Sequence, residues 1–215
     1  MLNVVFCDLD KTLISKNCSF GFGVYLFKRG ILTLPKAFLL TLHYASFSIG
    51  FLSARSLHQK SFALLFRGKR KMQIVKLAED YIETELLQHV FPRVVEVLTR
   101  LKEEGGTLHL LSTSPDFLVD ICARRLGFDS SFGTEFLTSA DGVFEKVGEV
   151  LDGEQKAEKA ETIASREASP KKTYALSDSL HDLSLLRAVN HPIAVNPSSR
   201  LRREALKRSW QILDP

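Results

Sequence analysis

Residues 6–15, close to the start of the chain, read FCDLDKTLIS. Two aspartates, Asp8 and Asp10, directly follow the apolar run 4–6, where a buried strand is expected to end. Side chains two residues apart lie on the same side of an extended chain, so these two carboxylates are neighbours. The sequence therefore predicts a pair of carboxylates at the edge of the core.

The chain is long and apolar enough to form a full hydrophobic core. It has 215 residues, 45% of them hydrophobic, which allows one domain with an insertion or two small domains. Its three cysteines, Cys7, Cys18 and Cys122, are an odd number without the spacing of a metal site, which favours a reducing compartment. Because Asp8 interrupts the first apolar run, no signal peptide is predicted, and we expect a cytoplasmic protein.

Residues 15–91 differ in composition from the rest of the chain. Between residues 15 and 78 there are eleven Lys or Arg and no Asp or Glu, together with eight of the fifteen phenylalanines. Helical patterns separated by glycines cover this region, which predicts an inserted, all-helical cap domain. The expected helices are 19–29, 34–49, 54–66 and 70–89.

The remaining residues, 1–14 and 92–215, have the pattern of an α/β domain. Short apolar strands alternate with helices, an order that is typical of a Rossmann-like core built on a parallel sheet. The strands are expected at 3–7, 107–111, 173–176 and 193–195, a hairpin at 134–138 and 143–147, and the helices at 93–104, 115–126, 154–166, 179–189 and 198–208.

Polar residues follow each predicted strand of this core. Asp8 and Asp10 follow the first strand, residues 112–114 the second, residues 177–179 the third and Asn196 the fourth. The ligand crevice of an open α/β sheet lies outside the carboxyl ends of its strands, so these segments are expected to converge there. The sequence thus predicts one site built from segments that are far apart in the chain.

The residue types in this site favour phosphate chemistry with a magnesium ion. Asp8, Asp10, Asp178 and Asp182 would form an oxygen-rich pocket, and Mg²⁺ prefers one or two carboxylates, water and substrate phosphate as ligands. Such a cation screens the repulsion between an attacking carboxylate and a phosphate group. The hydroxyls and amides of residues 112–114, at the start of the next helix, are suited to phosphoryl oxygens.

Four motifs resemble those of the haloacid dehalogenase superfamily, in its phosphoserine-phosphatase-like branch. In order along the chain they are DLDKTL at 8–13, LHLLSTS at 108–114, LDGEQK at 151–156 and YALSDSLHDL at 174–183. The resemblance covers nearly the whole chain, and this branch carries a helical cap between its first two motifs, where the basic insertion lies. It implies a phosphatase, a phosphoric monoester hydrolase that works through an aspartyl phosphate.

The resemblance also implies a role for individual residues. Asp8 would be the nucleophile, and Asp10 the general acid that protonates the leaving alcohol and then the base that activates water. Thr12 would orient Asp10, and it is grouped with the residues that bind the substrate. Ser112 would bind the phosphoryl group that is transferred, and the neighbouring Thr113 is an undecided candidate for the same contact.

The charges of the site are assigned by the same resemblance. A carboxylate of Asp8, the backbone carbonyl of Asp10 and the side chain of Asp178 would hold Mg²⁺. Asp182 would either bind the ion or support the groups that do. Lys156 would stabilise the charge of the phosphoryl group together with Asp8.

The chain departs from the family pattern at two places. Ser177 stands before Asp178, where the family usually has glycine. Asn17 stands where phosphoserine phosphatases carry a glutamate that meets the substrate ammonium, and the neighbouring Lys16 makes an ammonium still less favourable. We therefore predict a small or lipid-like anionic phosphomonoester as the small-molecule partner, with phosphoserine as the alternative.

Plainer interpretations are kept for several site residues. Lys159 competes with Lys156 for the lysine role, although the Gly-x-x-Lys spacing favours Lys156. Ser114 is interpreted as the N-cap of the helix 115–126 rather than as a ligand. Asp182 could face solvent on its own helix.

Two stretches of the insertion invite broader functions. Residues 31–52 are long enough to span a bilayer, but Pro35, Lys36 and several hydroxyl residues favour a cap helix, with contact at a membrane surface as the alternative. The run RGKRK, residues 67–71, is interpreted as a solvated turn, so no nucleic acid is expected as a partner. A binding module that keeps the phosphate pocket without turnover is the alternative to an enzyme, and the oligomeric state is left open.

Overall fold

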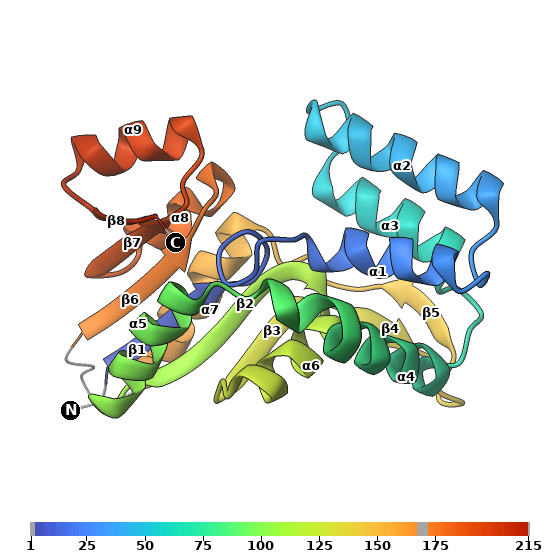
Figure 1. Cartoon of the computed structure of the whole chain (residues 1–215), viewed down its shortest axis with the longest axis horizontal. Coiled ribbons are helices and arrows are strands. Elements are labelled where there is room, and N and C mark those ends of the chain that lie inside the picture. The colour runs from blue at the N-terminus through green and yellow to red at the C-terminus, as the bar shows by residue number, and fades with distance from the viewer. Residues whose placement is uncertain (1–2, 167–171, 215) are drawn as a thin grey trace.

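A six-stranded parallel sheet forms the centre of the computed structural model, which describes residues 3–166 and 172–214. The strand order is β3–β2–β1–β6–β7–β8, so the two neighbours of β1 come from segments more than 100 and 160 residues away along the chain. The strands are β1 (Asn3–Asp8), β2 (Thr107–Pro115), β3 (Ser130–Thr134), β6 (Lys172–Ser177), β7 (His191–Val195) and β8 (Gln211–Leu213). This central position places the end of β1 in the middle of the sheet edge (Figure 1).

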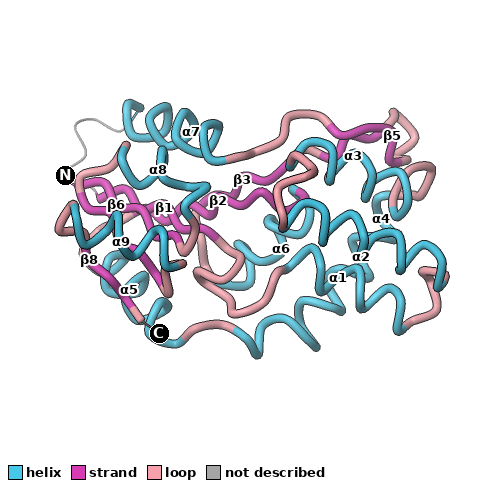
Figure 2. Tube along the Cα trace, turned by 90° about the horizontal axis from the view of Figure 1, so that it is seen from above, coloured by secondary structure: helices cyan, strands magenta, loops and turns pink. Residues whose placement is uncertain are grey.

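Helices cover both faces of the sheet, because the strand residues alternate between two apolar layers. Val5 and Cys7 pack in one core with α5 (Pro92–Glu103) and α6 (Asp116–Leu126). Val4 and Phe6 pack in the other core with α7 (Gly153–Arg166), α8 (Leu183–Arg187) and α9 (Ser199–Lys207). Figure 2 shows α7 and α5 on opposite sides of the strands. The predicted α/β parallel-sheet fold is confirmed.

A helical segment lies between β1 and α5, on one side of the sheet (Figure 1). It comprises α1 (Cys18–Lys28), α2 (Leu34–Ser48), α3 (Ala54–Leu65) and α4 (Lys71–Tyr81), followed by a π-helical turn (Ile82–Leu86) and a 3₁₀ turn (Leu87–His89). The chain enters and leaves this segment side by side. The amide of Ser15 donates to the carbonyl of His89, and the amide of Phe91 donates to the carbonyl of Leu13, both at 2.9 Å. Its division from the core at residues 15 and 91 stays a prediction.

The hairpin β4 (Phe136–Thr138) and β5 (Phe144–Val147) packs against these helices although it follows β3 in the chain. The ring centroids of Phe62 on α3 and Phe136 lie 5.1 Å apart, and those of Phe66 and Phe144 lie 5.8 Å apart. Backbone bonds continue the contact, since the amide of Gly68 donates to the carbonyl of Phe144 at 2.9 Å. The hairpin and the inserted helices therefore share one aromatic core.

Some element boundaries differ from those predicted. The strands β3 and β8 were not predicted, because the sequence SSFGT of β3 is only partly buried and β8 has three residues. The predicted helix 179–189 is a 3₁₀ turn (Leu180–Asp182) followed by the short α8. The stretch 31–52 forms α2 and then turns at Gly50, whose φ is +83°. Within residues 3–166 and 172–214, none of the helices has the length and hydropathy needed to cross a bilayer.

Candidate active site

The polar ends of three adjacent strands meet at the carboxyl edge of the sheet. Asp8 ends β1 and pairs in register with Leu111 of β2, while Cys7 pairs with Leu176 of β6. The residues that follow these partners, Ser112–Ser114 and Ser177–Asp178, consequently lie beside Asp8. The convergence expected from the sequence is present, and its cause is the parallel register of three neighbouring strands.

A buried lysine joins two of the predicted carboxylates. Lys156 Nζ donates to Asp8 Oδ1 at 2.7 Å and to Asp182 Oδ2 at 2.9 Å, and its side chain is only 2% exposed. Ser177 Oγ donates to Asp182 Oδ2 at 2.8 Å, so the serine in place of the usual glycine supports this carboxylate. The alternative in which Asp182 faces solvent is wrong. Lys159 lies over the ring of Phe132, 5.2 Å from its centroid.

Gly153 allows the helix that carries Lys156 to approach the loop that carries Asp182. A Cβ atom at Gly153 would lie 1.8 Å from the carbonyl oxygen of His181, which no packed structure tolerates. Because α7 begins at this glycine, Lys156 stands in its first turn and reaches Asp8. This contact gives a physical reason for the Gly-x-x-Lys spacing.

The charges of this cluster do not balance. Burial raises the pKa of Asp8 to about 8, which the Lys156 ammonium opposes and the Asp182 and Asp10 carboxylates increase. Burial lowers the pKa of Lys156, but the charges of Asp182 and Asp8 outweigh it and the pKa lies above its usual value. For Asp178, burial and then the charge of Asp182 raise the pKa to about 6. The site therefore holds more negative charge than one ammonium can compensate.

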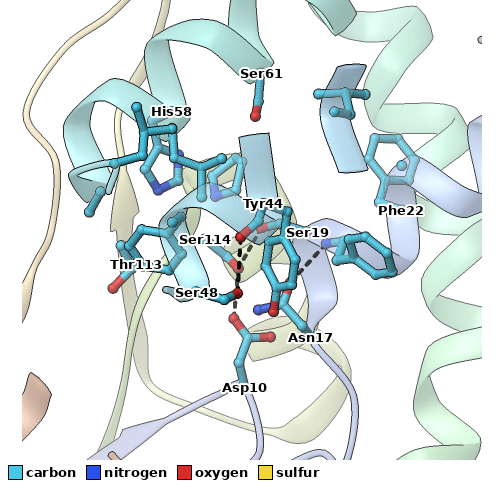
Figure 3. A pocket seen from close by; sticks show the side chains of 18 of the residues that line it. Asp10, Asn17, Ser19, Phe22, Tyr44, Ser48, His58, Ser61, Thr113 and Ser114 are labelled. Atoms are coloured by element: carbon cyan, nitrogen blue, oxygen red, sulfur yellow. Dashed lines mark hydrogen bonds between the residues drawn. The ribbon is translucent and has the colours of Figure 1, made fainter. Parts of the chain in front are cut away.

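Asp10 is hydrogen-bonded to the start of α1 and to the end of β2. Its Oδ1 accepts from the amide of Cys18, the first residue of α1, and its Oδ2 accepts from Ser114 Oγ at 2.9 Å. Ser114 Oγ lies 2.7 Å from Ser19 Oγ, and since Ser114 donates to Asp10, Ser19 donates to Ser114 (Figure 3). Burial raises the pKa of Asp10, which the bonds from Cys18 and Ser114 oppose.

The interpretation of Ser114 as a helix cap is wrong. The strand β2 continues to Pro115 and α6 begins only at Asp116, with no side chain capping it. Ser114 is therefore still extended, and its hydroxyl is free to bond to Asp10. Sequence reasoning also missed Ser19, although its position after the first motif and at the start of a helix is a usable signal.

The three residues predicted to bind substrate lie in different environments. Thr12 is fully buried; its Oγ1 donates to Asp8 Oδ2 at 3.0 Å and accepts from the amide of Asp178 at 2.9 Å. These bonds differ from the predicted orientation of Asp10, because Asp10 is held by α1 and β2 instead. Ser112 is buried, and its Oγ accepts from the amide of Ser114 at 3.1 Å. Thr113 lies on the wall of the adjoining cavity (Figure 3).

The donor groups fit a magnesium ion. Thr12 Oγ1 lies 3.0 Å from Asp8 Oδ2 and 3.3 Å from Asp178 Oδ1, so these two carboxylates are close neighbours and both are hard oxygen donors. Within the described part of the chain, no three or more His, Cys, Asp or Glu side chains surround one point. A Mg²⁺ ion held by one or two carboxylates, a backbone carbonyl and water satisfies both observations. Asp182 already accepts hydrogen bonds from Lys156 and Ser177, which suits a residue that supports the ligands rather than binding the ion itself.

A cavity of about 1130 Å³ opens over Asp8 and Asp10. It extends from the sheet edge between α1, α2 and α3, as the side chains of Ser19, Tyr44 and Ser61 show in Figure 3. The catalytic candidates therefore lie at one end of a deep space, and the inserted helices form the other end.

Residues of all four sequence motifs line this cavity. A family model described as haloacid dehalogenase-like hydrolase matches residues 5–187. The chain belongs to this family. The predicted resemblance is thus confirmed, and so is the prediction that the protein is a hydrolase.

Relatives within the family include phosphatases. The chain is 30% identical to phosphoserine phosphatase SerB1 of Mycobacterium tuberculosis over 97% of its own length and 70% of the relative's. It is 26% identical to a histidinol-phosphatase of Neisseria meningitidis, over 100% and 99% of the two chains. The predicted class of enzyme, a hydrolase of phosphoric monoesters, agrees with these relatives.

The fold also has a close counterpart among solved structures. A protein of unknown function from Bordetella pertussis Tohama I shares it with a TM-score of 0.90, at 22% identity, over 99% of this chain and 98% of the other. At this level of identity the likeness concerns the fold alone.

Proposed function

We propose that the protein is a magnesium-dependent phosphatase that hydrolyses phosphomonoesters through an aspartyl phosphate, an acyl phosphate formed on Asp8. The observation that carries this proposal is the hydrogen-bonded group of Asp8 and Lys156 at the end of β1, with Asp10 facing the cavity two residues later. A nucleophile beside a fixed cation, with a separate carboxyl group aimed at the leaving group, meets the needs of phosphoryl transfer.

The chain's own residues would carry both chemical steps. An oxygen of Asp8 attacks phosphorus, the bond from phosphorus to the alcohol oxygen breaks, and Asp10 gives that oxygen its proton. Asp10 then takes a proton from water, whose oxygen attacks phosphorus, breaks the bond to Asp8 and releases inorganic phosphate. Lys156 holds Asp8 and stabilises phosphoryl charge, while Ser114 and Cys18 keep Asp10 directed at the leaving oxygen.

Magnesium, when bound by Asp8, Asp178 and the carbonyl of Asp10, supplies positive charge that screens the phosphate from the attacking carboxylate. The excess of buried carboxylates over ammonium groups supports this assignment. In the same proposal Asp182 fixes Lys156 rather than the ion, because Lys156 and Ser177 already occupy its oxygen Oδ2.

The substrate is proposed to differ from phosphoserine. Asn17 stands at the place of the glutamate in phosphoserine phosphatases, and its Oδ1 accepts from the amide of Phe20 at 2.8 Å as the N-cap of α1. A neutral side chain that caps a helix offers no charge to a substrate ammonium. A small or lipid-like anionic phosphomonoester is therefore favoured over an amino-acid phosphate.

Hydrolysis of p-nitrophenyl phosphate tests the activity. We expect turnover that requires Mg²⁺ and stops on chelation, and no turnover with Asp8→Asn. Asp10→Asn is expected to reduce turnover strongly, because Asp10 also activates the water that hydrolyses the aspartyl phosphate. If the wild type shows no metal-dependent turnover at all, the proposed phosphatase activity is contradicted. The alternative that remains is then a module that binds phosphate without turnover. Phosphoserine, assayed beside it, is expected to be the poorer substrate in kcat/KM.

A second candidate function is attachment to an anionic membrane surface through α2. None of the fifteen residues of this helix is buried, and Phe51, which follows the turn at Gly50, is 85% exposed. Residues 15–78 supply eleven basic and no acidic side chains, which complements anionic lipid. We expect the protein to float with anionic vesicles and not with neutral ones. We expect the variant Phe51→Ser to lose this binding. The predicted cytoplasmic location stays a prediction.

A further inference from the structure

The cavity over Asp8 has two chemically different ends. The end at the sheet is lined by ionisable groups, among them Asp8, Asp10, Lys11, Lys156 and Asp178. The end between α1, α2 and α3 is lined by side chains without charge. Its apolar members include Phe20, Val24, Phe27, Leu40, Phe47 and Leu57. A phosphate group and an apolar group can thus be accommodated at opposite ends of one space.

Hydroxyl and amide groups are the main polar contribution of the helices to this cavity. They come from Asn17, Ser19, Thr41, Tyr44, Ser48 and Ser61. The imidazole of His58 also lies there, packed edge-on against Phe136 with 6.1 Å between the ring centroids. Burial holds the pKa of His58 at about 4, so this ring is neutral near pH 7. Within the described residues, no Asp, Glu, Lys or Arg of α1, α2 or α3 lines this cavity.

A charged leaving group would be costly in this environment. The ammonium and carboxylate of an amino alcohol, or the imidazolium of histidinol, would lose water without gaining an ion partner. An apolar chain gains free energy from the same burial, about fourfold in affinity for each methylene, the factor that corresponds to about 0.8 kcal/mol. The lining therefore selects by the polarity of the alcohol.

The helix α2 supports the same conclusion from its position. It has no buried residue, yet Leu40, Tyr44 and Phe47 on it line the cavity. The ring of Tyr44 lies against that of Phe20 on α1, with 4.9 Å between the centroids, which places α2 as an outer wall of this space. An apolar wall with few neighbours of its own is completed by an apolar ligand chain.

We propose that the substrates are phosphomonoesters of long, uncharged, apolar alcohols, whose chain lies between α1, α2 and α3 while the phosphate meets Asp8. This inference rests on the proposed phosphatase activity and adds the class of leaving group. A single acyl or alkyl chain and an isoprenyl chain share the chemistry that the lining recognises.

Gly23 provides a way to fill the cavity without disturbing the fold. It lies on α1 one turn after Ser19, it lines the cavity, and a Cβ atom placed on it would have no neighbour within 4 Å. A larger side chain there also improves helix propensity. Gly23→Leu is the first variant, and Ser61→Leu, from the opposite wall on α3, is the second. Ala63→Leu is the matched control, because Ala63 is exposed on α3 outside the cavity lining.

The experiment compares kcat/KM for ethyl, hexyl and decyl phosphate below their aggregation concentrations, with Mg²⁺. We expect the wild type to prefer hexyl to ethyl phosphate by about 250-fold, as four buried methylenes at about fourfold each require. Gly23→Leu and Ser61→Leu are expected to lower the preference for decyl over ethyl phosphate at least about tenfold, and Ala63→Leu to leave it unchanged. Lysophosphatidic acid and an isoprenyl phosphate then separate the two sources of chain.

The outcomes separate this inference from the activity on which it rests. Absence of hydrolysis of p-nitrophenyl phosphate refutes the phosphatase itself. Hydrolysis of that ester with a flat dependence on chain length refutes only the apolar leaving group, as does a preference for phosphoserine over decyl phosphate. A chain-length preference that both filling variants leave intact places the chain elsewhere and overturns the assignment to this cavity.

Discussion

Lys156 is the buried cation on which the stability of the site depends, and its replacement by methionine isolates the charge. The side chain makes two charge-assisted bonds, at 2.7 Å to Asp8 and 2.9 Å to Asp182. Methionine keeps most of the volume, so the loss is mainly electrostatic. Removing one partner from a buried ion pair costs about 3–5 kcal/mol, because the remaining charge stays desolvated. We expect Lys156→Met to lower the free energy of unfolding by this amount at pH 7.

The assay is urea unfolding at pH 7 in the presence of a chelator. The loss is a large part of the roughly 5–15 kcal/mol that stabilises a typical domain. Adding Asp182→Asn removes one unpaired carboxylate, so the double variant should recover about 1–3 kcal/mol relative to Lys156→Met. Lys159→Met is the control on the same helix; its ammonium lies over the ring of Phe132, and we expect a loss of about 1 kcal/mol or less.

Two results would refute this reasoning. A loss below about 1 kcal/mol in Lys156→Met would mean that the Asp182 carboxylate is already neutral or hydrated without the lysine. A double variant no more stable than Lys156→Met would mean that Asp182 carries no excess charge in the site.

Three further predictions concern single residues. Ser114→Ala should lower kcat about tenfold for alkyl phosphates, because Ser114 positions Asp10 for proton transfer to the leaving alcohol. The loss should be smaller for p-nitrophenyl phosphate, whose leaving group needs no proton from Asp10. Equal losses with both substrates would argue against this positioning role of Ser114. Gly153→Ala should lower the free energy of unfolding by about 1–3 kcal/mol, measured by thermal unfolding, because the added Cβ atom meets the His181 carbonyl. The same substitution should lower kcat, and full activity would contradict this prediction. Burial holds the pKa of His58 at about 4, against about 6.5 unfolded, so the unfolded chain binds the extra proton between these values. The free energy of unfolding should therefore fall as the pH drops from 6.5 to 4, by up to about 3 kcal/mol, and urea titrations of His58→Leu should lack this contribution.

The fold was predictable where local pattern and burial agree. The strand Asn3–Asp8 is buried along its whole length, and the apolar run within it predicts a buried strand from the sequence alone. The edge strands β3 and β8 carry little apolar signal, because one is half-buried and the other has three residues. Their presence depends on pairing with β2 and β7, which is a tertiary contact that no local pattern contains.

The site was predictable to the level of its motifs, not of its hydrogen bonds. Lys156 follows a glycine at a fixed spacing, and the structure shows the close approach that requires this glycine. Ser114 was misinterpreted because serine before Pro115 also fits a helix cap, and only the continued strand decides between the two. The partner of Thr12 could not be foreseen either, since Asp178 lies 166 residues away along the chain.

The hairpin β4–β5 changes what counts as a transferable part of this enzyme. The helices of residues 15–91 form one continuous insertion, but Phe62 and Phe66 complete their core with Phe136 and Phe144 from beyond the sheet strand β3. Grafting the insertion alone onto another hydrolase would expose the rings of Phe62 and Phe66. Deleting the insertion would leave the hairpin without the helices against which it packs. Exchange of specificity between members of the family therefore requires two segments to travel together, chosen by spatial contact rather than by continuity of the sequence.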